Sequence, residues 1–440
     1  MATVIRNGFV VTSQGIVKQD ILIKEGKIAN LGRIEHIEHQ ATAENVIDAS
    51  GKYILPGLID CHVHFREPGQ EQKEDWLTGS MAAAAGGVTT VLDMPNNKEP
   101  IITQELLDRK KEAAKKSIVN YGLYVGATPE NAKTVSSLHG IVGVKAYLGS
   151  STGSLLLNNL KDFAVLMEHA TVPVVAHCEN EQLLQYFGEK YAATEMHHVM
   201  RDNLCATIST IQAALIAERL QKRLHIAHVS TKEEIGFLQH IKSFSSNITF
   251  EVTPHHLFLT KQYFINEKNA GKNYGKMNPP LRADEDQIAL WKAVTSGLAD
   301  CIATDHAPHT KEEKEKPFHS SPCGVPGVQT ILPLLLNEVS KGILSLQDIA
   351  RLCAENPARI FRLQNKGKIQ EGYDADLVIV DMGVIKEIRD EDQYSKCGWT
   401  PFHGWTCKGW PVMTIVNGNV AMEDGKVYEG QKGKQVETTW

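Results

Sequence analysis

The chain has 440 residues, and its 46 basic and 52 acidic side chains give a formal net charge of -6. This mixed composition lacks the basic footprint of a nucleic-acid-binding protein, and no uncharged apolar stretch approaches the ~20 residues that a membrane helix needs. The first residues contain no signal-peptide core. We therefore expect a cytosolic protein that acts on a small molecule, with no nucleic-acid or membrane partner.

Short apolar, β-rich runs alternate with helical patterns between residues 53 and 305. The predicted strands are 53–60, 88–93, 118–126, 141–148, 172–177, 223–229, 246–252 and 299–304. The helical stretches include 75–85, 104–116, 160–169, 205–221 and 286–295. Such alternation indicates parallel strands joined by right-handed crossovers. Eight units predict an α/β fold of the (β/α)8 TIM-barrel type, with a doubly wound open sheet as the alternative.

Both ends of the chain differ from the middle. They carry short strands separated by turn pairs, which are Asn7-Gly8, Glu25-Gly26, Asn417-Gly418 and Asp424-Gly425. The simplest arrangement is a small β-sandwich built from both termini, which would cover exposed strand edges. We therefore predict a composite sandwich domain of residues 1–50 and 365–440 and a barrel domain of residues 51–364.

Two histidines stand at the end of the first predicted barrel strand. His62 and His64 are two residues apart, and alternate side chains of a strand share one face, so both imidazoles can hold a single cation. Asp60 is expected to orient an imidazole from behind. Taken alone, the pair fits a metal site and two ordinary polar strand-end residues equally well.

Further candidate ligands end later strands, where barrels of this type place their chemistry. His177 ends the fifth predicted strand. His225 and His228 end the sixth and lie on opposite faces, and we choose His228 because it is nearer the strand end. Asp305 ends the eighth strand, where it could bind metal and transfer protons or instead cap the next helix.

Lys145 lies in the otherwise apolar fourth strand, where a charged amine is costly to bury. One resolution is a snorkelling or paired side chain. The other is a depressed pKa that lets the amine react with carbon dioxide, forming a carbamate that bridges two cations. The surrounding candidate ligands favour the carbamate.

Four imidazoles, one aspartate and a bridging carbamate suit two divalent ions that share a hydroxide. Nitrogen-rich ligation with open positions points to zinc. The eight cysteines include no C-x-x-C pair and no compact disulfide spacing, so we expect reduced thiols. Cys61, Cys178 and Cys301 lie near candidate ligands but are expected to be packed thiols, because neighbouring strand positions face opposite sides.

Together these residues resemble the cyclic amidohydrolases of the metal-dependent amidohydrolase superfamily, and within it the class I dihydroorotases. The resemblance spans roughly residues 1–430. The motifs that carry it are His62-Val63-His64-Phe65-Arg66-Glu67-Pro68-Gly69, Asp93-Met94-Pro95-Asn96, Ala176-His177-Cys178-Glu179, Ala227-His228-Val229-Ser230, Met277-Asn278-Pro279-Pro280-Leu281-Arg282 and Thr304-Asp305-His306-Ala307-Pro308-His309. It implies the reversible cyclisation of N-carbamoyl-L-aspartate to L-dihydroorotate in pyrimidine biosynthesis.

The resemblance also implies a role for each site residue. One metal would bind His62, His64 and Asp305, the second would bind His177 and His228, and carboxylated Lys145 would bridge the two zinc ions. Asp305 would also be the catalytic general acid/base. The implied substrate-binding residues are His64, Arg66, Asn96, Asn278, His309, Cys323 and Gly324.

Two features separate this chain from its relatives. Many bacterial class I members carry aspartate at the position of Lys145, and Cys323-Gly324 replaces a more usual Phe-Gly, so that only its backbone could make the same contact. The rival functions are a dihydropyrimidinase, hydantoinase or allantoinase, and more remotely a non-catalytic barrel subunit. Arg66 argues against the first group, because their rings carry no carboxylate. The oligomeric state stays open, a homodimer being one alternative.

Overall fold

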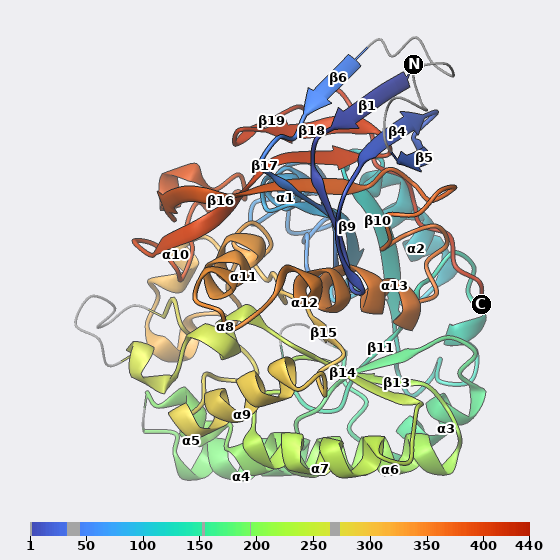
Figure 1. Cartoon of the computed structure of the whole chain (residues 1–440). Helices are drawn as coiled ribbons and strands as arrows, with labels where there is room; N and C mark the ends of the chain where they lie inside the picture. Colours follow the sequence, from blue (N-terminus) through green and yellow to red (C-terminus); the bar gives the residue numbers. More distant parts are fainter. Residues whose placement is uncertain (1, 33–44, 152–154, 194, 265–272) are drawn as a thin grey trace.

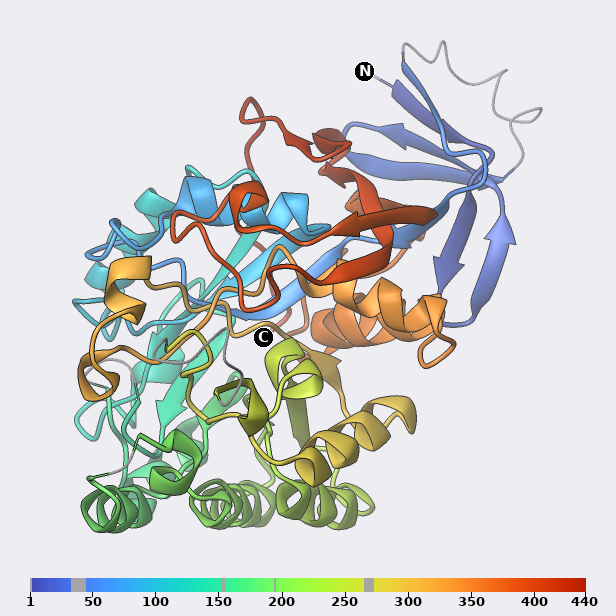
Figure 2. The same cartoon turned by 90° about the vertical axis from the view of Figure 1, so that its left-hand side faces the viewer.

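The computed structural model describes residues 2–32, 45–151, 155–193, 195–264 and 273–440. Part of the predicted terminal domain, residues 33–44, lies outside the described residues. Strands from both ends of the chain, blue and red in Figure 1, gather at one end of the molecule, and α6 (Asn203–Arg219) and α7 (Lys232–Lys242) lie at the other. Figure 2 shows the same separation after a quarter turn.

Eight parallel strands form the central sheet. Their order follows the chain: β8 (Leu58–Val63), β9 (Val88–Asp93), β10 (Asn120–Gly126), β11 (Gly143–Tyr147), β12 (Val174–His177), β13 (Leu224–Ile226), β14 (Ile248–Val252) and β15 (Cys301–Ile302). The two ends of this row meet, because Val63 pairs in parallel with His306 and the His64 amide donates to the His306 carbonyl at 2.8 Å. The predicted closed barrel is therefore confirmed over the open sheet.

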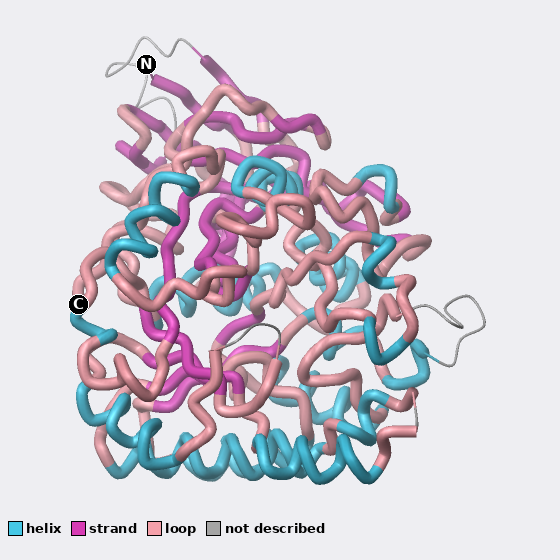
Figure 3. The backbone as a smooth tube through the Cα atoms, turned by 180° about the vertical axis from the view of Figure 1, so that it is seen from behind, coloured by secondary structure: helices cyan, strands magenta, loops and turns pink. Residues whose placement is uncertain are grey.

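Helices follow the barrel strands and cover the outside of the sheet, as the view from behind in Figure 3 shows. They are α1 (Trp76–Ala85), α2 (Gln104–Ala114), α3 (Leu160–His169), α4 (Glu181–Lys190), α5 (His197–Met200), α6, α7, α8 (Pro254–Phe258), α9 (Asp284–Thr295), α10 (Lys311–Lys314), α11 (Ile331–Ser340), α12 (Leu346–Ala350) and α13 (Asn356–Ile360). Side-chain caps fix where several of them begin, as when Asp75 accepts from the Thr78 amide. In the described part of the chain, no helix has both the length and the apolar character to cross a membrane.

Short 3-10 or π turns connect some of these elements. They are η2 (Val135–Ser137), η3 (Lys261–Phe264), η5 (Phe318–Ser320), η6 (Arg351–Glu355) and η7 (Asp390–Asp392). The π turn η6 joins α12 to α13 without a break, which brings Phe361 against the inside of the barrel.

Two further sheets lie outside the barrel; the first is built from N-terminal strands, and the second combines both ends of the chain. The first has the order β5 (Lys27–Gly32), β4 (Asp20–Lys24), β1 (Ala2–Arg6) and β6 (Asn45–Asp48). The second has the order β19 (Lys426–Val427), β18 (Asn419–Glu423), β17 (Thr406–Val416), β16 (Leu377–Glu387), β7 (Tyr53–Pro56), β2 (Phe9–Thr12) and β3 (Gly15–Lys18). Apolar side chains of both sheets share one core, which includes Ile21, Ile54 and Ile415. The domain boundaries stay a prediction.

The predicted strand 53–60 is two strands. Tyr53–Pro56 belongs to the terminal sheet as β7, and Leu58–Val63 enters the barrel as β8. Gly57 separates them, and a Cβ atom there would lie 2.3 Å from the Thr89 side chain. Only glycine therefore lets the chain pass this close to β9.

Candidate metal centre and substrate cavity

The first group of candidate ligands lies at the closure of the barrel. His62 comes from β8, His64 from the turn after it, and Asp305 from the turn after β15. One oxygen of Asp305, Oδ1, is 2.9 Å from His64 Nε2 and 3.3 Å from His62 Nε2. Burial raises the pKa of the Asp305 carboxyl, but the two imidazoles outweigh it and hold that pKa well below its usual range. The three side chains form a site able to hold one cation.

The second group of ligands adjoins the first. His177, which ends β12, places its Nδ1 atom 3.0 Å from Nε2 of His228. The His228 ring lies 5.4 Å from the His62 ring, measured between centroids. His228 has a φ of 38°, so the chain turns sharply after β13 and carries this imidazole into the cavity. The four predicted histidines therefore meet in one place.

Three of the imidazoles contact an acceptor side chain through the ring nitrogen that faces away from the cavity. Glu251 contacts Nδ1 of His62, Asn96 Oδ1 lies 2.6 Å from Nδ1 of His64, and Glu179 Oε2 lies 2.9 Å from Nε2 of His177. Each contact leaves the other ring nitrogen facing the cavity. Metal-binding histidines are typically oriented in this way, because the outer hydrogen bond fixes the tautomer.

Lys145 of β11 is fully buried beside these ligands. Its Nζ atom has no hydrogen-bond partner among the described residues. Burial lowers the pKa of Lys145 to about 8, so a minor share of the amine is neutral at pH 7, far more than for an ordinary lysine. A neutral, unpartnered amine in this position is the state that reacts with carbon dioxide.

A single cavity collects nearly all of the predicted site residues. Its lining contains His62, His64, Arg66, Asn96, Lys145, His177, His228, Asn278, Asp305, Cys323 and Gly324. Tyr147, Ser151 and Ala307 complete the wall. His309 is the predicted residue that does not line it; its Nε2 atom lies 3.3 Å from Arg66 Nη2 and 3.0 Å from the Cys323 carbonyl.

Arg66 brings a buried positive charge to this cavity. Its side chain is held by the Pro308 carbonyl, which accepts from Nε at 3.2 Å, and by His309. No carboxylate of the described residues forms an ion pair with the guanidinium. Such a group can bind a carboxylate of a bound molecule through two parallel hydrogen bonds.

Gly324 lines the same cavity in a backbone conformation that favours glycine. Its φ is +136°, and a Cβ atom would lie 2.5 Å from the Ala307 carbonyl oxygen. The backbone at this position therefore approaches Ala307 more closely than a residue with a Cβ atom would allow.

The residue that orients the His62 imidazole is Glu251, whereas the sequence had suggested Asp60 for this role. The Asp60 carboxylate accepts from the backbone amides of His62 and Thr304, at 3.3 and 3.0 Å, and so supports the chain rather than a ring. Glu251 holds the His62 imidazole instead. The sequence contains an indication of this role, because a glutamate inside the apolar strand β14 is as costly to bury as Lys145.

Comparisons with known proteins agree with this geometry. Residues 53–421 match the model of the amidohydrolase family. A dihydroorotase of Methanothermobacter thermautotrophicus is 40% identical, covering 93% of this chain and 92% of its own, and a dihydroorotase of Bacillus thuringiensis is 38% identical, covering 95% and 97%.

Among solved structures, an L-hydantoinase (dihydropyrimidinase) from Arthrobacter aurescens matches with a TM-score of 0.92 and 28% identity, covering 99% of both chains. A dihydropyrimidinase from Brevibacillus agri matches with a TM-score of 0.88 and 26% identity, covering 97% of this chain and 96% of its own.

Proposed function

Because the chain belongs to the amidohydrolase family, we propose that it is a dihydroorotase, which interconverts N-carbamoyl-L-aspartate and L-dihydroorotate by closing or opening one cyclic amide bond. Relatives of that name are 38–40% identical over nearly the whole chain. The reaction needs a polarised carbonyl, a proton carrier at the ring nitrogen and a group that binds the substrate carboxylate. Candidates for all three tasks line the one cavity.

The observation that carries the choice of substrate is the buried charge of Arg66. A guanidinium that is 3% exposed and lacks an ion-pair partner in the described chain is costly unless an anion binds beside it. L-Dihydroorotate carries a carboxylate on its ring, whereas dihydrouracil and hydantoin do not. Asn96 and Asn278 add polar groups to the same wall.

The donor set fits two zinc ions. His62, His64 and Asp305 would hold one, His177 and His228 would hold the other, and Lys145 would bridge them after its amine adds carbon dioxide to give a carbamate and release a proton. Bound there, the ions would polarise the substrate carbonyl and lower the pKa of water to about 7. The unpartnered Lys145 amine is the support for the bridge.

Asp305 is suited to carry the proton. In ring opening its carboxylate takes a proton from the attacking water and passes it to the departing ring nitrogen, and in cyclisation it carries a proton from the carbamoyl nitrogen to the oxygen that leaves as water. His64 steadies it through the 2.9 Å contact to Oδ1. Arg66 meanwhile fixes the substrate carboxylate, so that the reacting amide stays beside Asp305.

The second candidate is a hydantoinase or dihydropyrimidinase, which the likeness to solved structures of those enzymes favours. Initial rates on L-dihydroorotate, dihydrouracil and allantoin separate the two, using zinc-loaded protein with bicarbonate present. We expect strong preference for L-dihydroorotate. Activity on the uncharged rings alone would overturn both the function and the role of Arg66. Zinc as the metal and the cytosolic location remain part of this proposal, and a homodimer is one alternative for the oligomeric state.

A further inference from the structure

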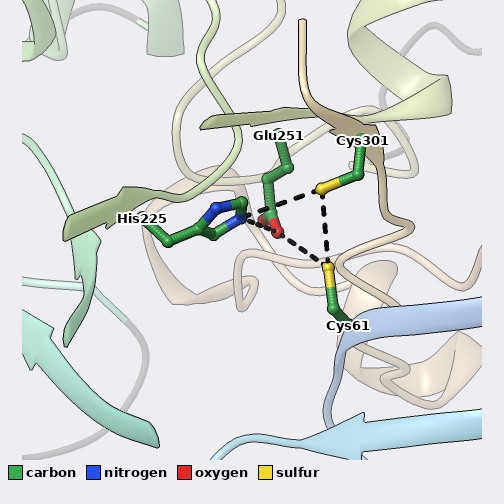
Figure 4. Close-up of side chains that lie close together, drawn as sticks. All are labelled: Cys61, His225, Glu251 and Cys301. Atoms are coloured by element: carbon green, nitrogen blue, oxygen red, sulfur yellow. Dashed lines mark hydrogen bonds and ion pairs between the residues drawn. The ribbon is translucent and has the colours of Figure 1, made fainter. Parts of the chain in front are cut away.

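A second cluster of metal-ligating side chains lies inside the barrel. Cys61 of β8, His225 of β13, Glu251 of β14 and Cys301 of β15 point toward one another (Figure 4). Each is at most 1% exposed. Inward positions of such barrels are usually filled by branched apolar side chains. It is therefore unusual to find four side chains of metal-ligand type, from four different strands, at inward positions of the barrel.

The distances within the cluster match four-coordinate zinc. The two Sγ atoms are 3.8 Å apart, His225 Nε2 is 3.9 Å from Cys301 Sγ and 3.1 Å from Glu251 Oε2, and Cys61 Sγ is 3.5 Å from Glu251 Oε2. Tetrahedral zinc with ordinary bond lengths places two sulfur ligands about 3.8 Å apart, a sulfur and a nitrogen or oxygen about 3.5 Å apart, and a nitrogen and an oxygen about 3.4 Å apart.

The two polar ligands already have their remaining atoms occupied. His225 Nδ1 lies 2.9 Å from the Thr249 hydroxyl, which leaves Nε2 facing the cluster. Glu251 uses Oε1 to contact the His62 ring and to accept from the His228 amide at 3.1 Å, which leaves Oε2 for the cluster. These outer contacts resemble the second-sphere hydrogen bonds of known metal sites.

We propose that Cys61, His225, Glu251 and Cys301 bind a structural zinc ion within the barrel, below the candidate catalytic centre. Binding replaces the protons of both thiols and the extra proton of a protonated His225, all of which leave to solvent, and yields two thiolates, one carboxylate and one neutral imidazole around the ion. Four protein ligands close the site, as is typical of structural rather than catalytic zinc. The ion would tie β8 to β13, β14 and β15 where the barrel closes, and Glu251 would link it to His62.

This inference does not depend on which cyclic amide is the substrate, and its test reads ligand type rather than turnover. Zinc X-ray absorption of the intact wild-type protein should show two sulfur ligands at about 2.3 Å for one of its ions. The proposed catalytic ligands are nitrogen and oxygen only. Zinc surrounded by nitrogen and oxygen alone, in protein loaded to constant metal content, would overturn the proposal.

Variants identify the thiols. Cys61→Ser and Cys301→Ser should each weaken the sulfur signal and lose about one zinc per chain, and cobalt-loaded protein should lose its thiolate charge-transfer absorption in parallel. Cys205→Ser, at a buried position of α6, and Cys323→Ser, in the substrate cavity, are the matched controls and should keep both signals. If one of the two cluster variants fails to fold, the wild-type spectrum and the other cluster variant still test the proposal.

Two outcomes would point elsewhere. Loss of the sulfur signal in Cys323→Ser, with the cluster variants unchanged, would move the thiolate to the substrate cavity and refute the core site. Peptide mapping without reductant that finds Cys61 joined to Cys301 in the native protein would show a disulfide instead of a metal site.

Discussion

Replacing Lys110 by methionine tests the buried ion pair that supports the site. Lys110 of α2 is fully buried; its ammonium contacts the Asp93 carboxylate and donates to the Met94 carbonyl at 2.6 Å and to Asn97 Oδ1 at 2.9 Å. Asp93 in turn accepts from the Phe65 amide at 2.6 Å, between His64 and Arg66. Methionine keeps much of the volume but leaves the carboxylate of Asp93 buried without its cation.

The cost can be worked out from the protonation of Asp93. Without Lys110, the buried Asp93 carboxylate can lose its charge by taking up a proton. From an ordinary pKa of about 3.9, this protonation costs about 4 kcal/mol at pH 7 and about 1.5 kcal/mol at pH 5. The value at pH 7 lies within the range of about 3–5 kcal/mol that is expected for breaking a buried ion pair. Burial already raises the pKa of Asp93 in the wild type, and Lys110 opposes that rise. Without Lys110 the folded-state pKa rises further above the unfolded value, so the destabilisation relative to wild type grows as the pH rises above the wild-type pKa of Asp93.

Urea unfolding of wild type and Lys110→Met at pH 5 and pH 7 measures this difference. Lys111→Met is the control, because Lys111 lies on the same helix in a partly exposed pair with Asp108 and should change the free energy of unfolding by less than about 1 kcal/mol. Adding Asp93→Asn to Lys110→Met should remove the pH-dependent part. A loss that is equal at both pH values, or no larger than that of Lys111→Met, would refute the reasoning.

Three further predictions concern the proposed chemistry. Asp305→Asn should retain its fold by circular dichroism and lose about 10²–10⁴-fold in kcat, the usual contribution of a general acid/base; a loss below tenfold contradicts that role. Arg66→Ala should lower kcat/KM for L-dihydroorotate about 30-fold or more, mainly through KM, because loss of a buried charged contact costs about 2–5 kcal/mol. A loss of bound metal in this variant would contradict the assignment of Arg66 to substrate binding. Lys145→Ala should lose metal and activity, with partial rescue by a short carboxylic acid, and full activity would exclude an essential bridge.

The sequence predicts most of the fold because the barrel repeats one signal eight times. Several strands end near a polar residue that the proposed chemistry requires, so the sequence alone places His62, His177 and Asp305 at strand ends. Strand periodicity predicts that His225 and His228 lie on opposite faces. In the structure both point to the inner side of the barrel, because His225 contacts Glu251 and Cys301 inside it and the positive φ of His228 turns the second imidazole into the cavity.

Other features depend on contacts between distant segments. The split at Gly57 follows from the closeness of Thr89, which the apolar run from 53 to 60 does not reveal. The approach of Cys61 to Cys301 joins residues 240 positions apart and arises only when the barrel closes. Local periodicity places Cys61 on the strand face opposite His62. Both side chains nevertheless contact Glu251, at a point where the pairing of β8 with β9 is irregular between Asp60 and Val63.

The seam at which the barrel closes has a mechanical consequence. It joins β8 to β15, a strand of only two residues, through the pairing of Val63 with His306. His62 and His64 stand on one side of this seam and Asp305 on the other. Any ligand held between them therefore stabilises the closed barrel by its binding energy, and opening of this seam would separate the residues that hold the ligand.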